Sequence, residues 1–352
     1  GVAGGNAPVR WGRIRARVPF AALDALAQLA AVQWIEEYHE PELFNNVAVQ
    51  PHLMNVTPVW ETNWLGLTGR GQVVAHADTG LDTGSLGTLH PDFTNRLRAA
   101  FSWARPGEWS DPNGHGTHTA GALAGNGSAL SNGLLKGVAF EAQLVHQSLY
   151  YDAFLPLGGL PTNLNLLFQQ AYNTNARIHS ISWGSAAAGA YNSAARDVDE
   201  FVWNHPDMLI VVAAGNGSDD SAGNGVVSRG TLASPASAKN ALSVGAAESD
   251  RPAGSGGYSS FVYGSGAWEP RFPVNPVHDD LVSTSADGVH QGMYGFSSRG
   301  PAADGRIKPD IVAPGTDIIS CRSRVGGAST FWGVYNENYM FSGGTSQATP
   351  LT

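Results

Sequence analysis

From Gly71 onward, short apolar runs alternate with segments of helical spacing, and this alternation constrains the fold more than any other feature of the sequence. The apolar runs, interpreted as strands, are residues 72–78, 142–146, 178–183, 208–214 and 241–245. Candidate helices between them are residues 115–123, 163–176 and 190–204. Buried strands in this βαβ order form a mostly parallel sheet with helices on both faces. The sequence therefore predicts an α/β fold with three layers around a doubly wound, mostly parallel sheet.

The composition favours one large folded domain. The chain has 352 residues, of which 42% are hydrophobic and 14% charged, and its 44 Gly and 20 Pro indicate many tight turns. A net charge of -9 disfavours polyanionic partners, so we expect no nucleic acid to bind, and no apolar run is long enough to suggest a membrane partner. The single cysteine, Cys321, cannot form an internal disulfide and is interpreted as a small buried residue.

Two segments depart from this rhythm. Residues 10–44 combine an alternating arginine run at 10–17, helical spacing at 20–30 and a second alternating run at 32–38, which predicts part of a small α+β module. Residues 252–292 are rich in Gly, Ser, Pro and aromatic residues, which predicts an ordered surface insertion.

Two polar motifs lie at predicted element ends. Asp78 ends an apolar strand before a Thr-Gly turn, at the sheet edge where such folds build their sites, although a cap or turn aspartate gives the same pattern. His115 begins a helix among small residues, in NGHGTHTAG. His115 and His118 could share a metal on one helix face, but the sequence lacks the HExxH form and an obvious third ligand.

A third motif surrounds Ser346. Gly343 and Gly344 allow a sharp turn into a helix whose first turn would carry this serine. Such a turn offers unpaired N–H groups that suit a developing oxyanion. A helix N-cap serine looks the same in isolation, so the interpretation depends on the combination of the three motifs.

Together these segments resemble the subtilisin family in their motif sequences and in the order Asp, His, Ser, which is the known order of the subtilisin triad. The matching motifs are DTG at Asp78, HGTHTAG at His115 and GTSQATP at Ser346. Further matches are HPDF at 90–93, SISWG at 180–184, AAGNG at 213–217, FSSRGP at 296–301 and KPDIVAPG at 308–315. The resemblance implies a subtilisin-like fold and a secreted serine endopeptidase of polypeptides, with a signal peptide that this chain does not contain.

The resemblance also implies the role of each residue. His115 would act as general base and then acid, Asp78 would hold the imidazole tautomer, and Ser346 would form the acyl-enzyme. Asn216 would donate its side-chain N–H to the oxyanion beside the Ser346 backbone N–H. A turn asparagine before Gly217 is the alternative.

Substrate is expected to add as a β-strand along one sheet edge, the mode that suits broad specificity. The edge residues are Ser182, Trp183 and Gly184. The wall of the first subsite would be formed by Ala213, Ala214 and Gly215. Because this wall is uncharged, we expect a large apolar or aromatic residue before the cleaved bond.

The chain ends carry two further expectations. Residues 1–44 resemble the last part of a subtilisin-family propeptide, and an ordinary extra domain is the alternative. The resemblance implies cleavage between Phe44 and Asn45. It also implies that residues 41–44 occupy the cleft and inhibit the enzyme. The catalytic domain would then be residues 45–352. Gln347 replaces the Met common in the family, and the helix after Ser346 is expected to continue, so we expect a C-terminally truncated domain with a missing continuation.

No cofactor is expected for the chemistry, and calcium is the one structural metal that the resemblance implies. Asp92 in the HPDF motif is an oxygen ligand in a fitting place, and the loop 126–132 could contribute, although solvated turn acids give the same pattern. His76, His146 and His179 alternate with apolar strand positions, which indicates hydrogen-bonded core or subsite residues rather than ligands.

Two other functions fit part of the pattern. A sedolisin-type acid peptidase shares the fold and the Gly-Thr-Ser turn but needs Glu in place of His115 and Asp in place of Asn216. A non-catalytic binding protein on the same scaffold would normally lose a triad residue, and this chain keeps all three. The short C-terminus is the feature that favours the binding protein.

Overall fold

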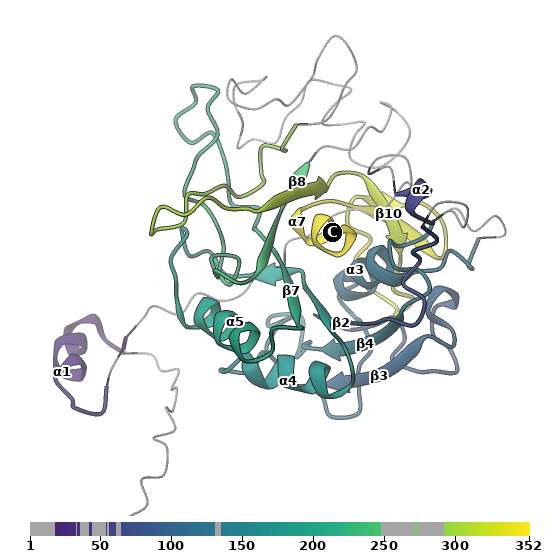
Figure 1. Ribbon diagram of the computed structural model, residues 1–352, viewed down its shortest axis with the longest axis horizontal. Coiled ribbons are helices and arrows are strands. Elements are labelled where there is room, and N and C mark those ends of the chain that lie inside the picture. Colours follow the sequence, from purple (N-terminus) through teal and green to yellow (C-terminus); the bar gives the residue numbers. More distant parts are fainter. Residues whose placement is uncertain are drawn as a thin grey trace, which may run out of the picture.

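The computed structural model describes residues 18–32, 34–35, 42–43, 54, 56–60, 65–130, 135–247, 272 and 292–352. Its centre is a sheet of seven parallel strands in the order β3-β4-β2-β5-β7-β8-β9 (Figure 1). The strands are β2 Val73–Asp78, β3 Leu97–Ser102, β4 Gln143–Ser148, β5 Ile178–Ile181, β7 Leu209–Ala213, β8 Leu242–Ala247 and β9 Ile311–Pro314. The predicted parallel α/β sheet is thus confirmed.

Helices cover both faces of this sheet (Figure 1). One face carries α4 (Asn165–Asn173) and α5 (Ser193–Asn204), and the other carries α3 (His115–Ala124) and α7 (Thr345–Leu351). Successive side chains of β7 point to opposite faces of the sheet. Ile210 and Val212 pack in the core on the side of α4 and α5. Val211 lies between them and belongs to the core that includes Ala348 of α7. These contacts give the predicted three layers.

The strand order reverses at β2. From β2 the chain first builds β3 and β4 on one side, and then crosses to build β5, β7, β8 and β9 on the other. In open parallel sheets, such a reversal leaves a crevice at the carboxyl ends of the central strands, where ligands bind. The site is therefore expected where β2 and β5 end, near Asp78 and Ser182.

A smaller antiparallel sheet leads into the last helix. It has the order β10-β12-β11, with β10 Ile318–Cys321, β11 Gly333–Val334 and β12 Tyr339–Ser342. The short elements α2 (Thr57–Trp60) and η2 (Pro91–Phe93) lie earlier in the chain. In the part of the chain that is described, no helix is both long and apolar enough for a membrane crossing.

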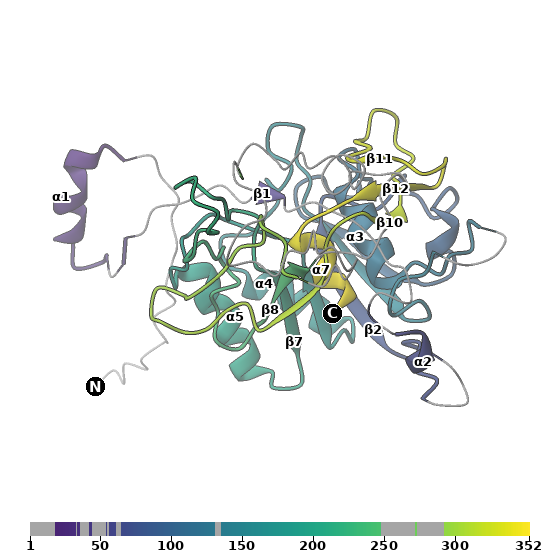
Figure 2. The ribbon, with the colours of Figure 1, turned by 90° about the horizontal axis from the view of Figure 1, so that it is seen from above.

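The N-terminal segment stands apart from the sheet, as Figures 1 and 2 show for α1. The helix predicted over 20–30 is shorter, with η1 at Phe20–Ala22 and α1 at Leu23–Ala27. The strand predicted over 32–38 is wrong at the described residues Val32, Trp34 and Ile35, none of which is in a strand. Trp34 is 73% exposed, so the alternating pattern there does not reflect a buried face. The strand predicted at 10–17 and all but residues 272 and 292 of the insertion lie outside the described residues.

One short pairing joins this segment to the sheet domain. β1 (Glu42–Leu43) pairs antiparallel with β6 (Trp183–Gly184), with Glu42 opposite Gly184 and Leu43 opposite Trp183. Residues 42–43 therefore lie along the strand edge predicted for substrate.

Candidate active site

The four candidate catalytic residues come from four places around the carboxyl edge of the sheet. Asp78 is the last residue of β2, His115 is the first of α3, and Ser346 is the second of α7. These three side chains are fully buried. Asn216 follows β7 and is half-buried.

Asp78 and His115 contact each other directly. His115 Nδ1 donates to Asp78 Oδ1 at 2.6 Å, and the Thr79 backbone N–H donates to the same oxygen at 2.7 Å. Burial opposes ionisation of Asp78, but the charge and hydrogen bond of His115 outweigh it and hold the pKa of this carboxyl below its usual value. Because Nδ1 carries the proton, Nε2 of a neutral His115 carries the lone pair that a general base needs.

A buried carboxylate holds the start of α3 in place. Asp111 accepts from the Gly114 N–H at 2.8 Å, the Thr117 N–H at 2.7 Å and the Thr79 hydroxyl at 2.8 Å. Gly114 has a φ of +94°, and an added Cβ would lie 2.9 Å from the Ser329 carbonyl oxygen. The helix that presents His115 is thus tied to the turn that follows Asp78.

Ser346 is held against the predicted substrate strand. Its Oγ donates to the Ser182 carbonyl at 2.8 Å, and Ser182 Oγ donates to the Ser346 carbonyl at 2.6 Å. The next residue, Gln347, contacts His118 of α3 with 3.0 Å between Nε2 and Nδ1. These bonds join α7 to both the strand edge and the helix that begins with His115.

Asn216 has its orientation fixed by Thr345. Asn216 Oδ1 accepts from the Thr345 backbone N–H at 2.9 Å and from Thr345 Oγ1 at 3.1 Å. The Gly215 N–H in turn donates to Thr345 Oγ1 at 3.1 Å. Because the carbonyl oxygen of the amide is committed to Thr345, the NH₂ group lies on the other side of the side chain.

The predicted substrate edge is described at all three residues. Ser182 lies between β5 and β6, while Trp183 and Gly184 form β6. Trp183 is buried, and its Nε1 donates to the Ala77 carbonyl at 2.8 Å, which fixes the edge against β2.

The predicted first-subsite residues begin with Ala213, the last residue of β7, and lead to Asn216. Ala213 and Ala214 are fully buried, and Ala213 packs against Ala233. Gly215 has a φ of +108°, and an added Cβ would lie 2.9 Å from both Ala233 Cβ and Ser298 Oγ, so only glycine fits there. Phe44 and Asn45, the predicted propeptide cleavage point, lie outside the described residues.

The surroundings of Asp92 do not fit calcium. The carboxylate accepts from the amides of Gly127 at 3.1 Å and Ala129 at 2.9 Å, from Tyr339 Oη at 2.9 Å, and from Cys321 Sγ at 3.4 Å. Calcium takes six to eight oxygen ligands, whereas N–H, O–H and S–H donors point their positive ends at this carboxylate. Hydrogen bonds hold the loop after α3 here, and calcium elsewhere in the chain stays a prediction.

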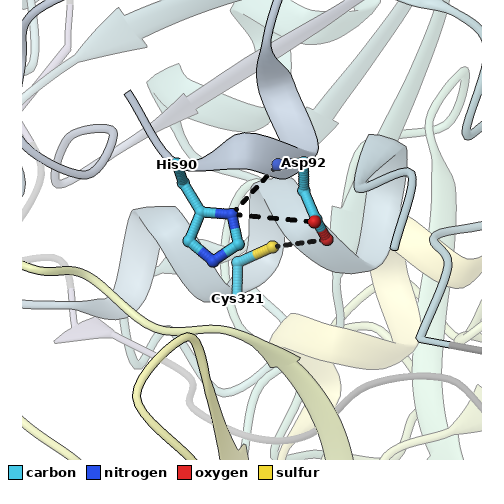
Figure 3. Close-up of side chains that lie close together, drawn as sticks. All are labelled: His90, Asp92 and Cys321. Atoms are coloured by element: carbon cyan, nitrogen blue, oxygen red, sulfur yellow. Dashed lines mark hydrogen bonds and ion pairs between the residues drawn. The ribbon is translucent and has the colours of Figure 1, made fainter. Parts of the chain in front are cut away.

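His90 and Cys321 lie beside the same carboxylate, as Figure 3 shows. His90 Nδ1 accepts from the Asp92 N–H at 3.2 Å, and His90 Nε2 donates to the Asn338 carbonyl at 2.9 Å. Burial raises the pKa of the Cys321 thiol well above its usual value, so sulfur stays protonated. The cluster is therefore a buried hydrogen-bonded core.

Several residues of the site were not predicted from the sequence. Thr345 orients Asn216, and Thr119 lies behind Asp78, where its Oγ1 is 3.4 Å from Asp78 Oδ2. The Phe331 ring contacts His115 edge-on with 6.4 Å between centroids, and Phe331 has a positive φ of 40°, which is rare for a bulky residue. Thr345 adjoins the Ser346 motif, which could have drawn attention to it, whereas no motif marks Phe331.

Comparisons with known proteins show which family the chain is similar to. Residues 69–352 match the family described as the subtilase family, Peptidase_S8. The chain is 29% identical over 340 residues to the serine protease/ABC transporter B family protein tagD of Dictyostelium discoideum, covering 81% of this chain and 18% of tagD. It is 30% identical over 307 residues to serine protease AprX of Bacillus subtilis (strain 168), covering 81% of this chain and 56% of AprX.

A solved cold-adapted subtilisin-like serine proteinase shares 20% identity with a TM-score of 0.47, covering 81% of this chain and 73% of that one. The chain spans only part of the length of tagD and AprX. The family match itself extends over most of the chain and includes all four candidate catalytic residues. On that ground, this chain belongs to the subtilase family.

Proposed function

We propose that the chain is a serine endopeptidase in which Asp78, His115 and Ser346 form the triad and Asn216 completes the oxyanion hole. The observation that carries the proposal is the buried 2.6 Å hydrogen bond from His115 Nδ1 to Asp78 Oδ1. A buried carboxylate bonded to Nδ1 fixes the tautomer in which Nε2 can accept a proton. The sedolisin alternative lacks support, because His115 and Asn216 occupy the positions where it needs Glu and Asp.

The reaction starts when Ser346 Oγ attacks the carbonyl carbon of the substrate peptide bond. Its proton, which now points to the Ser182 carbonyl, turns to His115 Nε2 as the C–O bond forms. The imidazolium beside Asp78 then gives this proton to the leaving amine as the C–N bond breaks. Water hydrolyses the ester by the same steps, with His115 again as the base, and Ser346 regains its proton.

The negative charge of the tetrahedral intermediate needs two donors. The backbone N–H of Ser346 and the side-chain NH₂ of Asn216 are the proposed pair. Two hydrogen bonds from Thr345 hold Asn216 before substrate arrives, so the amide does not have to reorganise during the reaction.

We propose that the substrate residues before the cleaved bond, on the nonprime side, pair with β6 as an added strand. The antiparallel pairing of Glu42 and Leu43 with this edge is the supporting observation, since it shows that an extended segment fits there. We infer that residues up to 44 act as an intramolecular inhibitor that occupies the cleft before maturation. If so, active enzyme should begin near residue 45, and active enzyme that begins at Gly1 would refute the inhibitor.

The preference before the cut is proposed to be apolar or aromatic, because Ala213, Ala214 and Gly215 offer no charge. The activity is tested with a peptide library and the purified full chain, using Ser346→Ala as the matched control. We expect hydrolysis by the wild type alone, with cleavage after large apolar residues. Strong selection for Arg or Lys would overturn the specificity, and equal activity of Ser346→Ala would overturn the mechanism. Extracellular action stays a prediction from the family resemblance.

A further inference from the structure

A chain of buried polar groups lies behind Asp78, on the side away from His115 Nδ1. Thr119 Oγ1 of α3 is 3.4 Å from Asp78 Oδ2 and 2.8 Å from His76 Nε2. His76 Nδ1 is 3.2 Å from Nδ1 of His146, its register neighbour on β4. All four side chains are fully buried. The order of contacts is therefore Asp78, Thr119, His76, His146.

Two arrangements of protons fit these distances. In the first, His76 carries its proton on Nδ1, donates to His146, and accepts from Thr119. In the second, His146 donates from Nδ1 to His76 Nδ1, and His76 donates from Nε2 to Thr119 Oγ1. Only the second leaves the Thr119 hydroxyl proton free of His76, because a hydroxyl has one proton. The proton then has three acceptors within reach, the His115 carbonyl at 3.1 Å, the Gly116 carbonyl at 3.2 Å and Asp78 Oδ2 at 3.4 Å.

Electrostatics favour the second arrangement. His76 Nε2 lies 3.8 Å from Asp78 Oδ2, so a lone pair there would face an anion, whereas an N–H presents its positive end. Among the described residues, His146 Nε2 has no hydrogen-bond partner. A buried bare acceptor is tolerated better than a buried bare N–H, and the second arrangement makes this nitrogen the acceptor.

Burial keeps both histidines neutral. The ionisable side chains that act on His76 or His146 are Asp78 on β2, His115 on α3, His179 on β5 and each other. Burial lowers the pKa of His76 to about 4 and that of His146 well below its usual value. Neutral imidazoles can relay a hydrogen bond toward Asp78 without adding a second cation beside His115.

We propose that His146, His76 and Thr119 form a relay of oriented hydrogen bonds that positions Asp78 and holds it ionised for its work on His115. This role rests on the proposed triad, because it assigns His76 and Thr119 as positioning residues for that reaction. In the second arrangement, His146 and His76 donate along the chain toward Thr119, whose hydroxyl lies 3.4 Å from the carboxylate. Without the relay, the negative charge of Asp78 acts more strongly on His115. Protonated His115 is then more stable, so its pKa rises.

The proton arrangement can be read without any activity. Long-range ¹H–¹⁵N spectra of the ¹⁵N-histidine-labelled full chain, carrying Ser346→Ala to prevent self-cleavage, distinguish the two histidine tautomers. We expect His76 to be protonated on Nε2 and His146 on Nδ1. The opposite tautomers would overturn the relay even if the chain is an active protease. These tautomers in an inactive wild type would refute the proposed function and leave the relay standing.

The second test is the acid limb of the kcat/KM profile against pH. His76→Leu and Thr119→Val should each move this limb to higher pH by about half a unit, because protonated His115 becomes more stable. The double variant should shift it no further, since both changes break one chain. His76→Gln should restore the wild-type limb, because its amide can donate to Thr119.

The matched control is His179→Leu. His179 is a buried histidine of the same sheet, but its Nε2 contacts Gln147 Oε1 at 2.9 Å rather than Thr119. Its loss should lower stability and leave the acid limb in place. If Thr119→Val also leaves the acid limb in place, the relay is refuted, even when His76→Leu fails to fold.

Discussion

Replacing Asn216 by Asp tests the oxyanion hole with almost no change of shape. Asn216 Oδ1 accepts two hydrogen bonds from Thr345, at 2.9 and 3.1 Å, and a carboxylate oxygen accepts both equally well. The substitution therefore keeps both bonds from Thr345, replaces the NH₂ group by oxygen and adds a negative charge. What is lost is a donor that acts on the charge of the transition state.

The expected loss of kcat in Asn216→Asp follows from the loss of this donor. Removing one oxyanion donor costs about 2.7–4 kcal/mol, which is roughly a hundredfold to a thousandfold in kcat. Asn216→Asp should lie at the upper end because it also adds negative charge near the oxyanion. KM should change little, since the neutral carbonyl of bound substrate depends less on this donor.

The assay is steady-state hydrolysis of a chromogenic peptide amide by wild type and variant, with urea unfolding to confirm equal stability. Thr345→Val is the graded control, because it keeps the backbone N–H to Asn216 and loses the two 3.1 Å bonds of Oγ1, to Asn216 Oδ1 and from the Gly215 N–H. Its kcat should fall about fivefold, the effect of about 1 kcal/mol. A loss below about tenfold in kcat for Asn216→Asp, or a change mainly in KM, would refute the assigned role.

Three further predictions concern stability and the substrate edge. Burial lowers the pKa of His76 to about 4 and of His118 and His179 to about 3, below the usual 6.5, so the unfolded chain binds more protons below pH 6.5. In the Ser346→Ala background, the unfolding free energy should then fall from pH 6.5 toward pH 4 by roughly 1.4 kcal/mol per pH unit for each histidine. Adding His179→Leu to this background should make the slope shallower. An unchanged slope in the double variant would contradict this prediction. Asp92→Ala should lower the unfolding free energy measured with urea by roughly 3 kcal/mol, because several buried donors lose their acceptor. Excess EDTA should not alter the difference between wild type and variant. A difference that appears only when calcium is present would favour a metal site. Trp183→Phe should lower stability by roughly 1–3 kcal/mol through the unpaired Ala77 carbonyl, and normal stability would show that this bond to β2 contributes little.

The sequence predicted the central sheet well because its inner strands are buried on both faces. Such strands appear as continuous apolar runs, as in β7 with Ile210, Val211 and Val212. β3 and β9 were not predicted, because they are the edges of the sheet. Ile311 and Val312 of β9 are partly exposed, and neither edge strand forms a long apolar run.

The site was predictable where a local motif fixes the backbone. Asp78, His115 and Ser346 each lie in a glycine-containing turn, and the turn determines where the side chain points. The relay behind Asp78 was not predictable, because the contact of His76 with His146 depends on the register of two strands 70 residues apart. The sequence indicated only that these histidines are hydrogen-bonded core or subsite residues, and the structure shows them buried and hydrogen-bonded to each other.

The donors around Asp92 show the same limit. The loop that carries Gly127 and Ala129 was expected to contribute near Asp92, but as a source of metal ligands rather than of N–H donors. No sequence pattern places β10 and β12, which supply Cys321 and Tyr339, beside the HPDF motif. A carboxylate in a fitting position suggested calcium, and only the three-dimensional contacts show that its oxygens already have donors.

The central claim is that Ser346 is a nucleophile activated by His115. Incubating the full chain with a fluorophosphonate and mapping the adduct by peptide mass spectrometry tests it directly, because the reagent reacts with an activated serine and not with an ordinary one. We predict one adduct, on Ser346, which is lost in His115→Ala and strongly reduced in Asp78→Asn. A folded chain that stays unlabelled after removal of residues 1–44, or one labelled equally in His115→Ala, would contradict the account.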